Sequence, residues 1–329
     1  MNANPHAPSG ATNERVLVTG AAGFIGSHLC RRLVAEGHEV IGLDDLTQGS
    51  ADNLRDVPEV RLVQGDIRDA AAVAAVARGC RAICHEAAIR SVPLSMREPV
   101  LTTEVNVLGT LNVLLAAKDE GAIVASASSS SVYGEQDAFP VHEGREPRPR
   151  SPYAASKLAA ETYCRAMWLS SGVRSVSLRY FNVFGPGQDP ASEYAAVVPR
   201  FVSACLNHGR PVIYGDGEQA RDFTYIDDAL EANLLAIRAP DRAFGRVFNI
   251  GGGRPPLSIN RLLGLIAELC GVEPDPMYEP PRDGDIRLSH ADVSSAGEVL
   301  GYRPTVVMNE GLRRTVESFR SIATSNATI

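Results

Sequence analysis

The stretch Arg15-Val-Leu-Val-Thr-Gly-Ala-Ala-Gly-Phe-Ile-Gly26 decides the fold of this 329-residue chain. Its first five residues are typical of a short buried strand, and a helical pattern follows the glycines to about Glu36. A second strand is expected at 39–43 and runs into Asp44, which lies 24 residues after Gly20. A strand, a glycine-rich turn, a helix and a strand ending in an acid together predict a dinucleotide-binding unit.

Each part of this unit has a physical role. Glycines let the backbone approach a pyrophosphate, and the N-terminus of the following helix attracts its charge. Asp44 is placed where a carboxylate binds both ribose hydroxyls and repels a 2′-phosphate, so NAD is expected rather than NADP. The spacing is GxxGxxG rather than GxGxxG, so the turn should differ in detail, and a glycine-rich turn without a ligand is the alternative. The expected cofactor contacts in this unit are Gly20, Gly23, Phe24, Ile25, Gly26 and Asp44.

A second cluster of chemistry-bearing residues lies in the middle of the chain. A run of serines ends in Val-Tyr-Gly at 132–134, and Ser-Pro-Tyr-Ala-Ala-Ser-Lys follows at 151–157. Ser151 is a good N-cap and proline suits the first helical position, so Tyr153 and Lys157 should share one face of a helix. Lowering a tyrosine pKa from about 10 to neutrality requires about 4 kcal/mol. We expect the lysine ammonium and the helix N-terminus to supply much of it.

Composition limits the class of protein. A chain of this length with 44% hydrophobic residues can bury one large α/β domain and a smaller lobe. The net charge of −7 argues against a nucleic-acid partner. No apolar run is read as approaching about 18 residues, so no membrane span is expected. Residues 1–13 lack the apolar core of a signal peptide and, like 321–329, are expected to be flexible.

The six cysteines, at positions 30, 80, 84, 164, 205 and 270, form no CxxC pair. Several lie within apolar stretches, which favours buried free thiols and a reducing, cytoplasmic compartment. Cys80, Cys84 and His85 would form a metal site only if they converged. They surround an expected strand, so no metal is expected.

The rest of the chain alternates between strand and helix patterns. Strands are expected at 60–64, 81–85, 122–127 and 174–179, and helices at about 69–77, 98–119, 151–171 and 195–207. This alternation predicts a doubly wound parallel sheet, an α/β Rossmann domain. After Arg179, Pro and Gly become frequent and helices are expected to be shorter, while 247–250 resembles one more core strand. We therefore expect an NAD-binding domain at 14–180 and about 222–252, interleaved with a smaller α/β substrate lobe at about 181–221 and 253–320.

Taken together, the motifs resemble those of the extended short-chain dehydrogenase/reductases, and among them most closely the UDP-hexose 4-epimerases. The likeness covers about residues 14–320. It is carried by Gly20–Gly26, Asp44, Gly65-Asp-Ile67, Asn106, Ser129–Tyr133, Tyr153 with Lys157, Leu178–Gly185 and Arg221-Asp-Phe223.

The resemblance implies a role for each matching residue. Tyr153 would be the catalytic base, Lys157 would bind the nicotinamide ribose, and Ser129 would bond the sugar's 4-oxygen. The further cofactor contacts implied are Asp66 and Ile67 at the adenine, with Ala87 and Asn106. The implied substrate contacts are Arg90, Ser91, Ser129, Ser130, Ser131, Asn182, Val198, Tyr214, Arg221, Arg282, Asp285 and Ser289. From the residues alone, Asp66 would serve equally as a turn residue, and Arg221 and Arg282 as surface charges, although bidentate arginines suit a diphosphate.

The serine run separates the expected reactions. The dehydratases of this family carry an Asp-Glu pair just before Val-Tyr-Gly, and the decarboxylases a glutamate, whereas this chain has Ser130 and Ser131. Without a carboxylate there, elimination lacks its proton shuttle. The expected reaction is therefore C4 epimerisation of a UDP-hexose through a transient 4-keto sugar, with tightly bound NAD. Another NAD-dependent nucleotide-sugar enzyme, such as a UDP-glucuronate 4-epimerase, a dehydratase or a reductase, remains the alternative. A non-catalytic NAD sensor would be expected to lack the Tyr or the Lys.

Two sequence positions restrict which UDP-sugars are expected as substrates. Ser289 is small where the family sets the size of the sugar pocket, which leaves room for a 2-acetamido group, so UDP-GlcNAc and UDP-GalNAc are expected alongside UDP-glucose and UDP-galactose. Asp189 lies where glucuronate-specific relatives carry an arginine, and its charge would repel a sugar carboxylate. The resemblance also implies a homodimer formed through the helices at 98–119 and 151–171.

Overall fold

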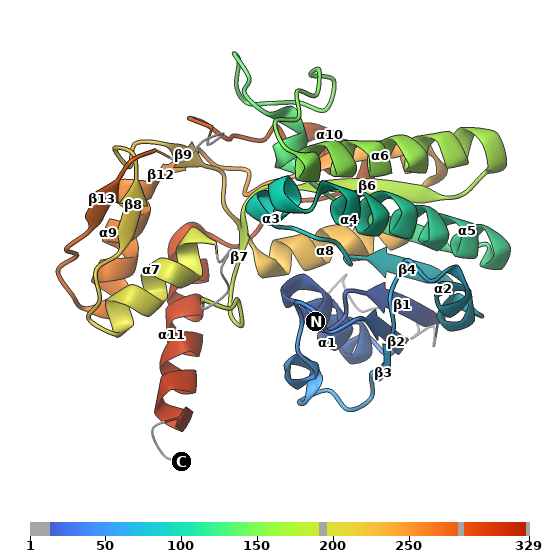
Figure 1. Cartoon of the computed structure of the whole chain (residues 1–329), viewed down its shortest axis with the longest axis horizontal. Coiled ribbons are helices and arrows are strands. Elements are labelled where there is room, and N and C mark those ends of the chain that lie inside the picture. Colours follow the sequence, from blue (N-terminus) through green and yellow to red (C-terminus); the bar gives the residue numbers. More distant parts are fainter. Residues whose placement is uncertain (1–13, 191–195, 282–285, 327–329) are drawn as a thin grey trace, which may run out of the picture.

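The computed structural model describes residues 14–190, 196–281 and 286–326, with side chains to residue 321. Its centre is a seven-stranded parallel sheet with the order β11-β6-β5-β4-β1-β2-β3 (Figure 1). The strands are β1 (Arg15–Thr19), β2 (Glu39–Asp44), β3 (Arg61–Gln64), β4 (Ala82–His85), β5 (Ile123–Ser129), β6 (Ser175–Tyr180) and β11 (Arg246–Ile250). The chain winds outward from β1 to β3 and then outward again from β4 to β11. The carboxyl ends of β1 and β4 therefore flank the switch point at which ligands bind in such sheets.

Helices cover both faces of the sheet. The helices α1 (Phe24–Ala35) and α8 (Ile226–Ile237) pack on one face, and α2 (Ala70–Ala77), α5 (Thr110–Glu120) and α6 (Pro152–Ser171) on the other. Alternate residues of β1 divide between the two cores: Val16 and Val18 belong to the first, and Leu17 to the second. Strands buried on both faces explain why the sequence shows continuous apolar runs rather than alternation.

The strands and helices expected from the sequence are confirmed with ends that differ by no more than two residues. The helix expected at 98–119 has a more complex form, because a π-helical segment (Glu104–Gly109) separates α4 (Pro99–Thr103) from α5. The short α3 (Val92–Arg97) and α8 are among the helices for which the sequence analysis gave no range. The doubly wound α/β class is thus confirmed.

The helix over 98–119 has one property that the sequence analysis did not single out. By length and apolar composition alone, the continuous helix Pro99–Glu120 is sufficient to cross a membrane. In the structure this helix packs against α2 and α6. It is a covering helix of the sheet, and core helices of this kind pass the same test.

A second group of elements lies beside the carboxyl end of the sheet (Figure 1). Here α7 (Val197–Leu206), α9 (Ile259–Cys270) and α11 (Met308–Asn326) pack on one another. Strand pairs complete this part: β8 (Val212–Tyr214) with β13 (Met277–Glu279), β9 (Ala220–Arg221) with β12 (Leu257–Ser258), and β7 (Val183–Phe184) with β10 (Thr224–Tyr225). The chain also forms α10 (Ser294–Leu300) and 3-10 turns at Ala51–Leu54, Ser130–Tyr133 and Asp241–Ala243. The expectation of shorter helices is wrong for α9 and α11, which have 12 and 19 residues.

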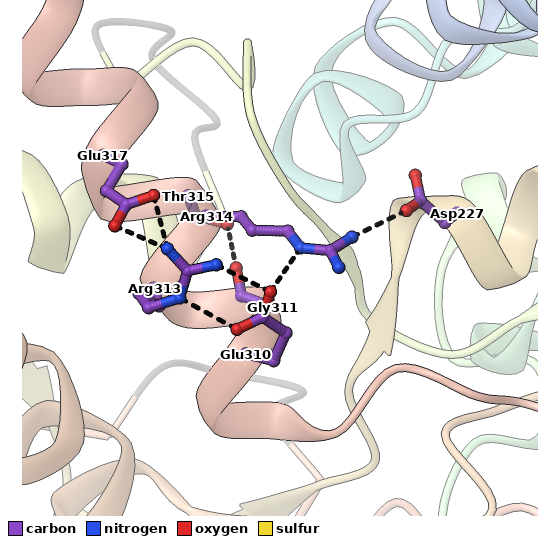
Figure 2. A network of polar contacts seen from close by, with 7 residues as sticks. All are labelled: Asp227, Glu310, Gly311, Arg313, Arg314, Thr315 and Glu317. Atoms are coloured by element: carbon purple, nitrogen blue, oxygen red, sulfur yellow. Dashed lines mark hydrogen bonds and ion pairs between the residues drawn. The ribbon is translucent and has the colours of Figure 1, made fainter.

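A charged network ties α11 to the start of α8 (Figure 2). Glu310 accepts hydrogen bonds from both Arg313 and Arg314, and Arg313 also pairs with Glu317 at 2.6 Å. Arg314 reaches from α11 to Asp227 in the first turn of α8, with an Nη1–Oδ2 distance of 3.2 Å. The network therefore connects the last helix to a helix that covers the central sheet.

Candidate active site

The helix α6 begins as its sequence predicts. The Ser151 hydroxyl caps it by accepting a hydrogen bond from the Ala154 N–H at 3.1 Å, and Pro152 occupies the first helical position. Tyr153 and Lys157 therefore lie one turn apart at the N-terminal end of α6, which packs against β5 and β6. Both residues are thus held near the carboxyl edge of the sheet.

Lys157 is buried, and its ammonium donates to the Ala127 carbonyl near the end of β5 at 2.8 Å. Burial lowers its pKa to about 8. Burial raises the pKa of Tyr153, while a hydrogen bond with Ser129 and the charge of Arg90 lower it. In this structure, then, the groups that favour the phenolate are Ser129 and Arg90, rather than Lys157 as the sequence led us to expect.

The serine run continues β5 into a 3-10 turn. Ser129 ends the strand, and its hydroxyl accepts a hydrogen bond from the Ser131 N–H and donates to the Ser131 hydroxyl, both at 3.1 Å. Ser130 and Ser131 open the turn and are partly exposed. The turn is anchored by Tyr133, whose hydroxyl donates to Asn249 at 2.7 Å. Hydroxyl groups, with no carboxylate among them, therefore occupy this turn beside Tyr153.

The glycine-rich turn joins β1 to α1. Gly20 has a φ of +69°, and a side chain there would lie 2.7 Å from the Ala87 nitrogen, while a Cβ on Gly26 would lie 2.0 Å from the Gly20 carbonyl oxygen. The N-cap residue Gly23 provides no side-chain cap, so the first N–H groups of α1, at Phe24, Ile25 and Gly26, lack a side-chain acceptor. An uncapped helix start behind a close-packed glycine turn fits a pyrophosphate group.

Asp44 ends β2, the strand beside β1, as predicted. Its carboxylate accepts hydrogen bonds from the Ala22 N–H at 2.9 Å and the Leu46 N–H at 2.8 Å, and burial raises its pKa. These two bonds fix the carboxylate beside the glycine turn. The arrangement fits a ribose diol more readily than a phosphate, because a second anion would be repelled.

The expected adenine contacts follow β3. Asp66 accepts bonds from the Arg68 guanidinium at 2.6 and 2.9 Å, and this cation lowers its pKa. These two residues line a cavity of about 460 Å³ together with Asp69, Glu104 and Leu108. Ile67 is buried under Gly109 of the π-helical segment. Of the two residues expected at the adenine, Asp66 thus borders a cavity, and Ile67 lies buried next to it in sequence.

Asn106 lies in the π-helical segment, and its amide is already engaged by the chain. Its Oδ1 accepts from the Ile89 N–H at 2.8 Å, and its Nδ2 donates to the Ile89 carbonyl and the Ser156 hydroxyl, both at 2.9 Å. It therefore connects the loop after β4, which contains Ala87 and Arg90, to α6. π-Helical insertions are frequently found at functional sites, where they redirect a side chain.

Four of the expected substrate residues form two pairs, one on each side of the carboxyl edge. Arg90 and Ser91 precede α3, and the Ser91 hydroxyl caps it by accepting from the Leu94 N–H at 3.0 Å. Across the carboxyl edge, Arg221 lies in β9, and Ser289 lies beside it because its N–H donates to the Ala220 carbonyl at 3.0 Å. Ser289 is buried.

The remaining expected substrate residues are placed less closely together. Asn182, at the end of β6, has a φ of +28°, and its amide donates to the Asp222 carbonyl at 2.9 Å. Val198 is buried in α7. Tyr214 lines a cavity of about 630 Å³, whose other lining residues include Glu135, Asp216, Gln219 and Arg287. Arg282 and Asp285 lie outside the described residues.

The cysteines and the histidine near β4 have ordinary structural surroundings. The two ring nitrogens of His85 are bonded to the hydroxyls of Thr19 at 2.7 Å and Thr110 at 2.9 Å, and burial lowers its pKa to about 3. All six cysteines are free thiols, five of them buried and Cys270 partly exposed. Within the described ranges, no group of three His, Cys, Asp or Glu is arranged to hold a metal ion.

Two features of the site were missed by sequence reasoning. Glu161 and Arg179 form a buried ion pair between the catalytic helix and β6. The four-residue spacing of Glu161 from Lys157 would have suggested a pair with that lysine instead. Glu86, directly after β4, accepts a hydrogen bond from the Tyr180 hydroxyl at 2.7 Å. No local pattern signals this second contact, because it joins residues 94 positions apart.

A doubly wound sheet with an uncapped glycine turn at β1 and a Tyr-x-x-x-Lys helix at the switch point defines an NAD-dependent enzyme of the short-chain dehydrogenase/reductase class. The model of the NAD dependent epimerase/dehydratase family matches residues 16–251, more than half of the chain. The chain belongs to this family.

Relatives with assigned activities span most of the chain. A UDP-glucose 4-epimerase of Mycolicibacterium smegmatis is 41% identical over 93% of this chain and 99% of its own length. A UDP-glucuronate 4-epimerase of Thermodesulfobacterium geofontis is 33% identical over 91% of this chain and 94% of its own. Sequence similarity alone therefore does not identify which UDP-sugar this chain acts on.

Solved structures give the same family. The UDP-glucose 4-epimerase of Thermotoga maritima, solved with UDP-glucose, has a TM-score of 0.89 and 38% identity, covering 94% of this chain and 99% of its own. The UDP-N-acetylglucosamine 4-epimerase of Methanobrevibacter ruminantium, solved with UDP-N-acetylmuramic acid, matches with the same TM-score, identity and coverage.

Proposed function

We propose that this enzyme interconverts the C4 epimers of a UDP-hexose, UDP-glucose and UDP-galactose or their 2-acetamido counterparts, through a transient 4-keto sugar. The observation that carries the proposal is the meeting of Tyr153 and Ser129, with Ser130 and Ser131 in the turn beside them. One base and one hydrogen-bonding hydroxyl suffice for epimerisation, whereas elimination of water needs a carboxylate shuttle.

The chain's own residues divide the work. Tyr153 takes the proton of the C4 hydroxyl, and Ser129 holds the 4-oxygen and lowers the pKa of Tyr153 through their hydrogen bond. Lys157 holds the nicotinamide ribose, and Gly20 to Gly26 with Asp44 hold the pyrophosphate and the adenosine ribose. NAD, when bound, supplies the acceptance and return of the C4 hydride. The 4-keto sugar rotates about its diphosphate link and presents its other face, and Tyr153 then returns the proton to the 4-oxygen.

The nucleotide and the hexose of the proposed substrate must be bound differently. The nucleotide must be held firmly, for which Arg221, Asn182 and the cavity with Tyr214 are the proposed contacts, joined by Arg90, Ser91 and Val198. The hexose must turn, which requires space, and the small Ser289 beside Arg221 would provide it. Asp189 is exposed and anionic, which disfavours a glucuronate carboxylate.

Domain limits, assembly and location are also proposals. β11 completes the sheet after the chain has left it, which supports an NAD domain of 14–180 and about 222–252 interleaved with the substrate lobe. Exposed apolar side chains on the two helices expected at the dimer contact support a homodimer: Val100, Leu108, Leu115, Tyr163 and Leu169. The free thiols support a cytoplasmic location.

The test is to purify the protein without added cofactor, extract and quantify NAD, and follow UDP-glucose, UDP-GlcNAc and UDP-glucuronate separately by NMR. We expect bound NAD and epimerisation of the first two sugars with no accumulation of NADH. NADH formed in proportion to turnover would instead identify a dehydrogenase. Loss of water or carbon dioxide would identify a dehydratase or decarboxylase, and preferred turnover of UDP-glucuronate would reassign the sugar.

A further inference from the structure

Glu86 is an acidic residue at the catalytic edge of the sheet that the proposed mechanism does not use. It follows directly on β4, and its N–H donates to the Thr19 carbonyl, so it continues the ladder between β4 and β1. Its carbonyl carbon would lie 3.0 Å from a Cβ on Gly20, the first glycine of the cofactor turn. The residue is only partly exposed. A carboxyl group is therefore built into the switch point itself.

The strand register places Glu86 next to the anchor of Lys157. In the β4–β5 ladder the last pair is His85 with Ser126, so Glu86 and Ala127 are the next positions on neighbouring strands, about 5 Å apart. Ala127 is the residue whose carbonyl accepts the bond from the Lys157 ammonium at 2.8 Å. The ammonium is thus fixed at the strand position next to Glu86. Lys157 reaches this position from α6 on one face of the sheet, and the Glu86 carboxyl group is held on the face of α8.

A buried clamp fixes the side chain of Glu86. The Tyr180 hydroxyl at the end of β6 donates to Glu86 Oε1 at 2.7 Å and in turn accepts a bond from Asn233 Nδ2 of α8 at 2.6 Å. Tyr180 reaches Glu86 across β5, because β6, β5 and β4 are successive strands. Asn233 is fully buried, so the far end of this chain of bonds is enclosed in the protein.

We propose that Glu86 is a positioning residue of the catalytic centre, which acts through Lys157 by keeping its ammonium protonated. The inference rests on the proposed function only in that Lys157 serves the reaction. Lys157 is buried, and burial favours its neutral form. A carboxylate held at a neighbouring strand position opposes that effect.

The groups around Glu86 favour this direction. Burial raises its pKa to about 7, and the Tyr180 hydrogen bond, the charge of Lys157 and Asn233 lower it. In return Glu86 raises the pKa of Lys157, which burial lowers to about 8. Glu86 also raises the pKa of Tyr153 of α6 and Cys84 of β4. Two further groups of α6, Glu161 and Cys164, raise the pKa of Lys157 alongside Glu86. Above about pH 7, where Glu86 is ionised, its charge therefore supports the Lys157 ammonium.

The chain offers an unusually clean way to measure this effect, because it contains only two lysines, Lys118 and Lys157. Lys118 is exposed on α5 and serves as an internal reference. In protein labelled with ¹³C and ¹⁵N at lysine, the two side chains give two NMR signals whose titration midpoints are read directly. No sugar is added, so the result stands whether or not the protein epimerises UDP-sugars.

The variant is Glu86→Gln, which keeps the shape of the side chain and removes its charge. We expect the Lys157 midpoint to fall by about 1 unit or more and that of Lys118 to stay unchanged. Tyr180→Phe removes the bond that favours the Glu86 carboxylate, so it should lower the Lys157 midpoint by a smaller amount. The matched control is Glu59→Gln, which removes an exposed charge just before β3, the outermost strand of the sheet. It should leave the titration midpoints of both lysines unchanged.

A kinetic readout follows from the same sign. The alkaline limb of the kcat profile, where Lys157 loses its proton, should move to lower pH in Glu86→Gln by the shift measured by NMR. A purely structural role of Glu86 would lower kcat at all pH values and leave this limb in place. An unchanged or raised Lys157 midpoint in Glu86→Gln would overturn the inference.

Discussion

Arg179 of β6 and Glu161 of α6 form an ion pair whose side chains are only 4% and 5% exposed. The Arg179 Nε and Nη2 atoms donate to the two carboxylate oxygens at 2.8 and 2.6 Å. Ser128 also donates to Glu161, and the guanidinium lies 4.6 Å from the centre of the Tyr133 ring. The pair therefore joins the helix that carries Tyr153 and Lys157 to β6, and Ser128, next to Ser129, ties the end of β5 to the same carboxylate.

Replacing Glu161 with Gln should leave the buried Arg179 charge without its partner. Loss of one member of a buried pair costs about 3–5 kcal/mol, to be measured as the change in the free energy of unfolding in urea. The control is Glu317→Gln, which removes one member of the exposed pair with Arg313 and should change stability little. Equal urea midpoints for the two variants would show that the buried pair contributes no more than a surface one.

Much of the fold could be predicted because its signals are local. Strands such as β2 and β6 are buried on both faces, so each appears as a short apolar run between turns. The start of α6 was predicted from a cap, a proline and the spacing of Tyr153 and Lys157, and all of these act within one helical turn. The glycine turn and Asp44 were placed for the same reason.

What could not be predicted depends on contacts between distant elements. The π-helical segment has no sequence signature, and Asn106 within it is fixed by Ile89 and Ser156. The influence of Arg90 on Tyr153 depends on the loop after β4, which the Asn106 amide ties to α6 through Ile89 and Ser156. The spacing of Tyr153 and Lys157 suggested instead that the lysine would lower the pKa of Tyr153. Spacing predicts a shared helix face, but it does not reveal which group the lysine ammonium binds.

Tyr153→Phe should fold, retain NAD and bind UDP, because the phenol ring is kept. Its turnover should fall at least about 10²-fold, the usual contribution of a positioned acid–base group. Tyr163→Phe is the matched control, since this tyrosine lies on the same helix with 41% of its surface exposed, and its turnover should match the wild type. Kcat is measured by coupled assay or NMR for all three proteins, and near-normal turnover in Tyr153→Phe would exclude it as the base.

The stability of the protein at low pH should depend on Glu310. Its bonds with Arg313 and Arg314 lower its pKa to about 2, below the value of about 4.3 expected in the unfolded chain. An acid whose pKa is lower in the folded protein stabilises the fold at pH values above its pKa in the unfolded chain. This contribution disappears as the pH falls towards 2. Between these values the Tm of the wild type should therefore fall more steeply than that of Glu310→Gln. Parallel Tm curves for the two proteins would show that the network in Figure 2 does not couple folding to this proton.

Ser289 provides the test of sugar size. It is buried beside Ala220 and Arg221, so a tyrosine there would extend a phenol ring into neighbouring space. Overpacking of this kind typically costs about 1–3 kcal/mol. If that space holds the 2-acetamido group, Ser289→Tyr should lower the turnover of UDP-GlcNAc by roughly tenfold to a hundredfold or more. UDP-glucose and UDP-galactose, which lack the group, should be affected much less.

The quantity to compare is the ratio of kcat/KM for UDP-GlcNAc and UDP-glucose, because damage to folding would lower both values and cancel. Ser289→Ala, which keeps the position small, should leave the ratio at its wild-type value. A selective loss of UDP-GlcNAc turnover in Ser289→Tyr alone would place this serine at the sugar's 2-substituent. An unchanged ratio would mean that the residue lies away from the sugar, and that the contact between the segment after β13 and β9 orders the lobe without selecting the substrate.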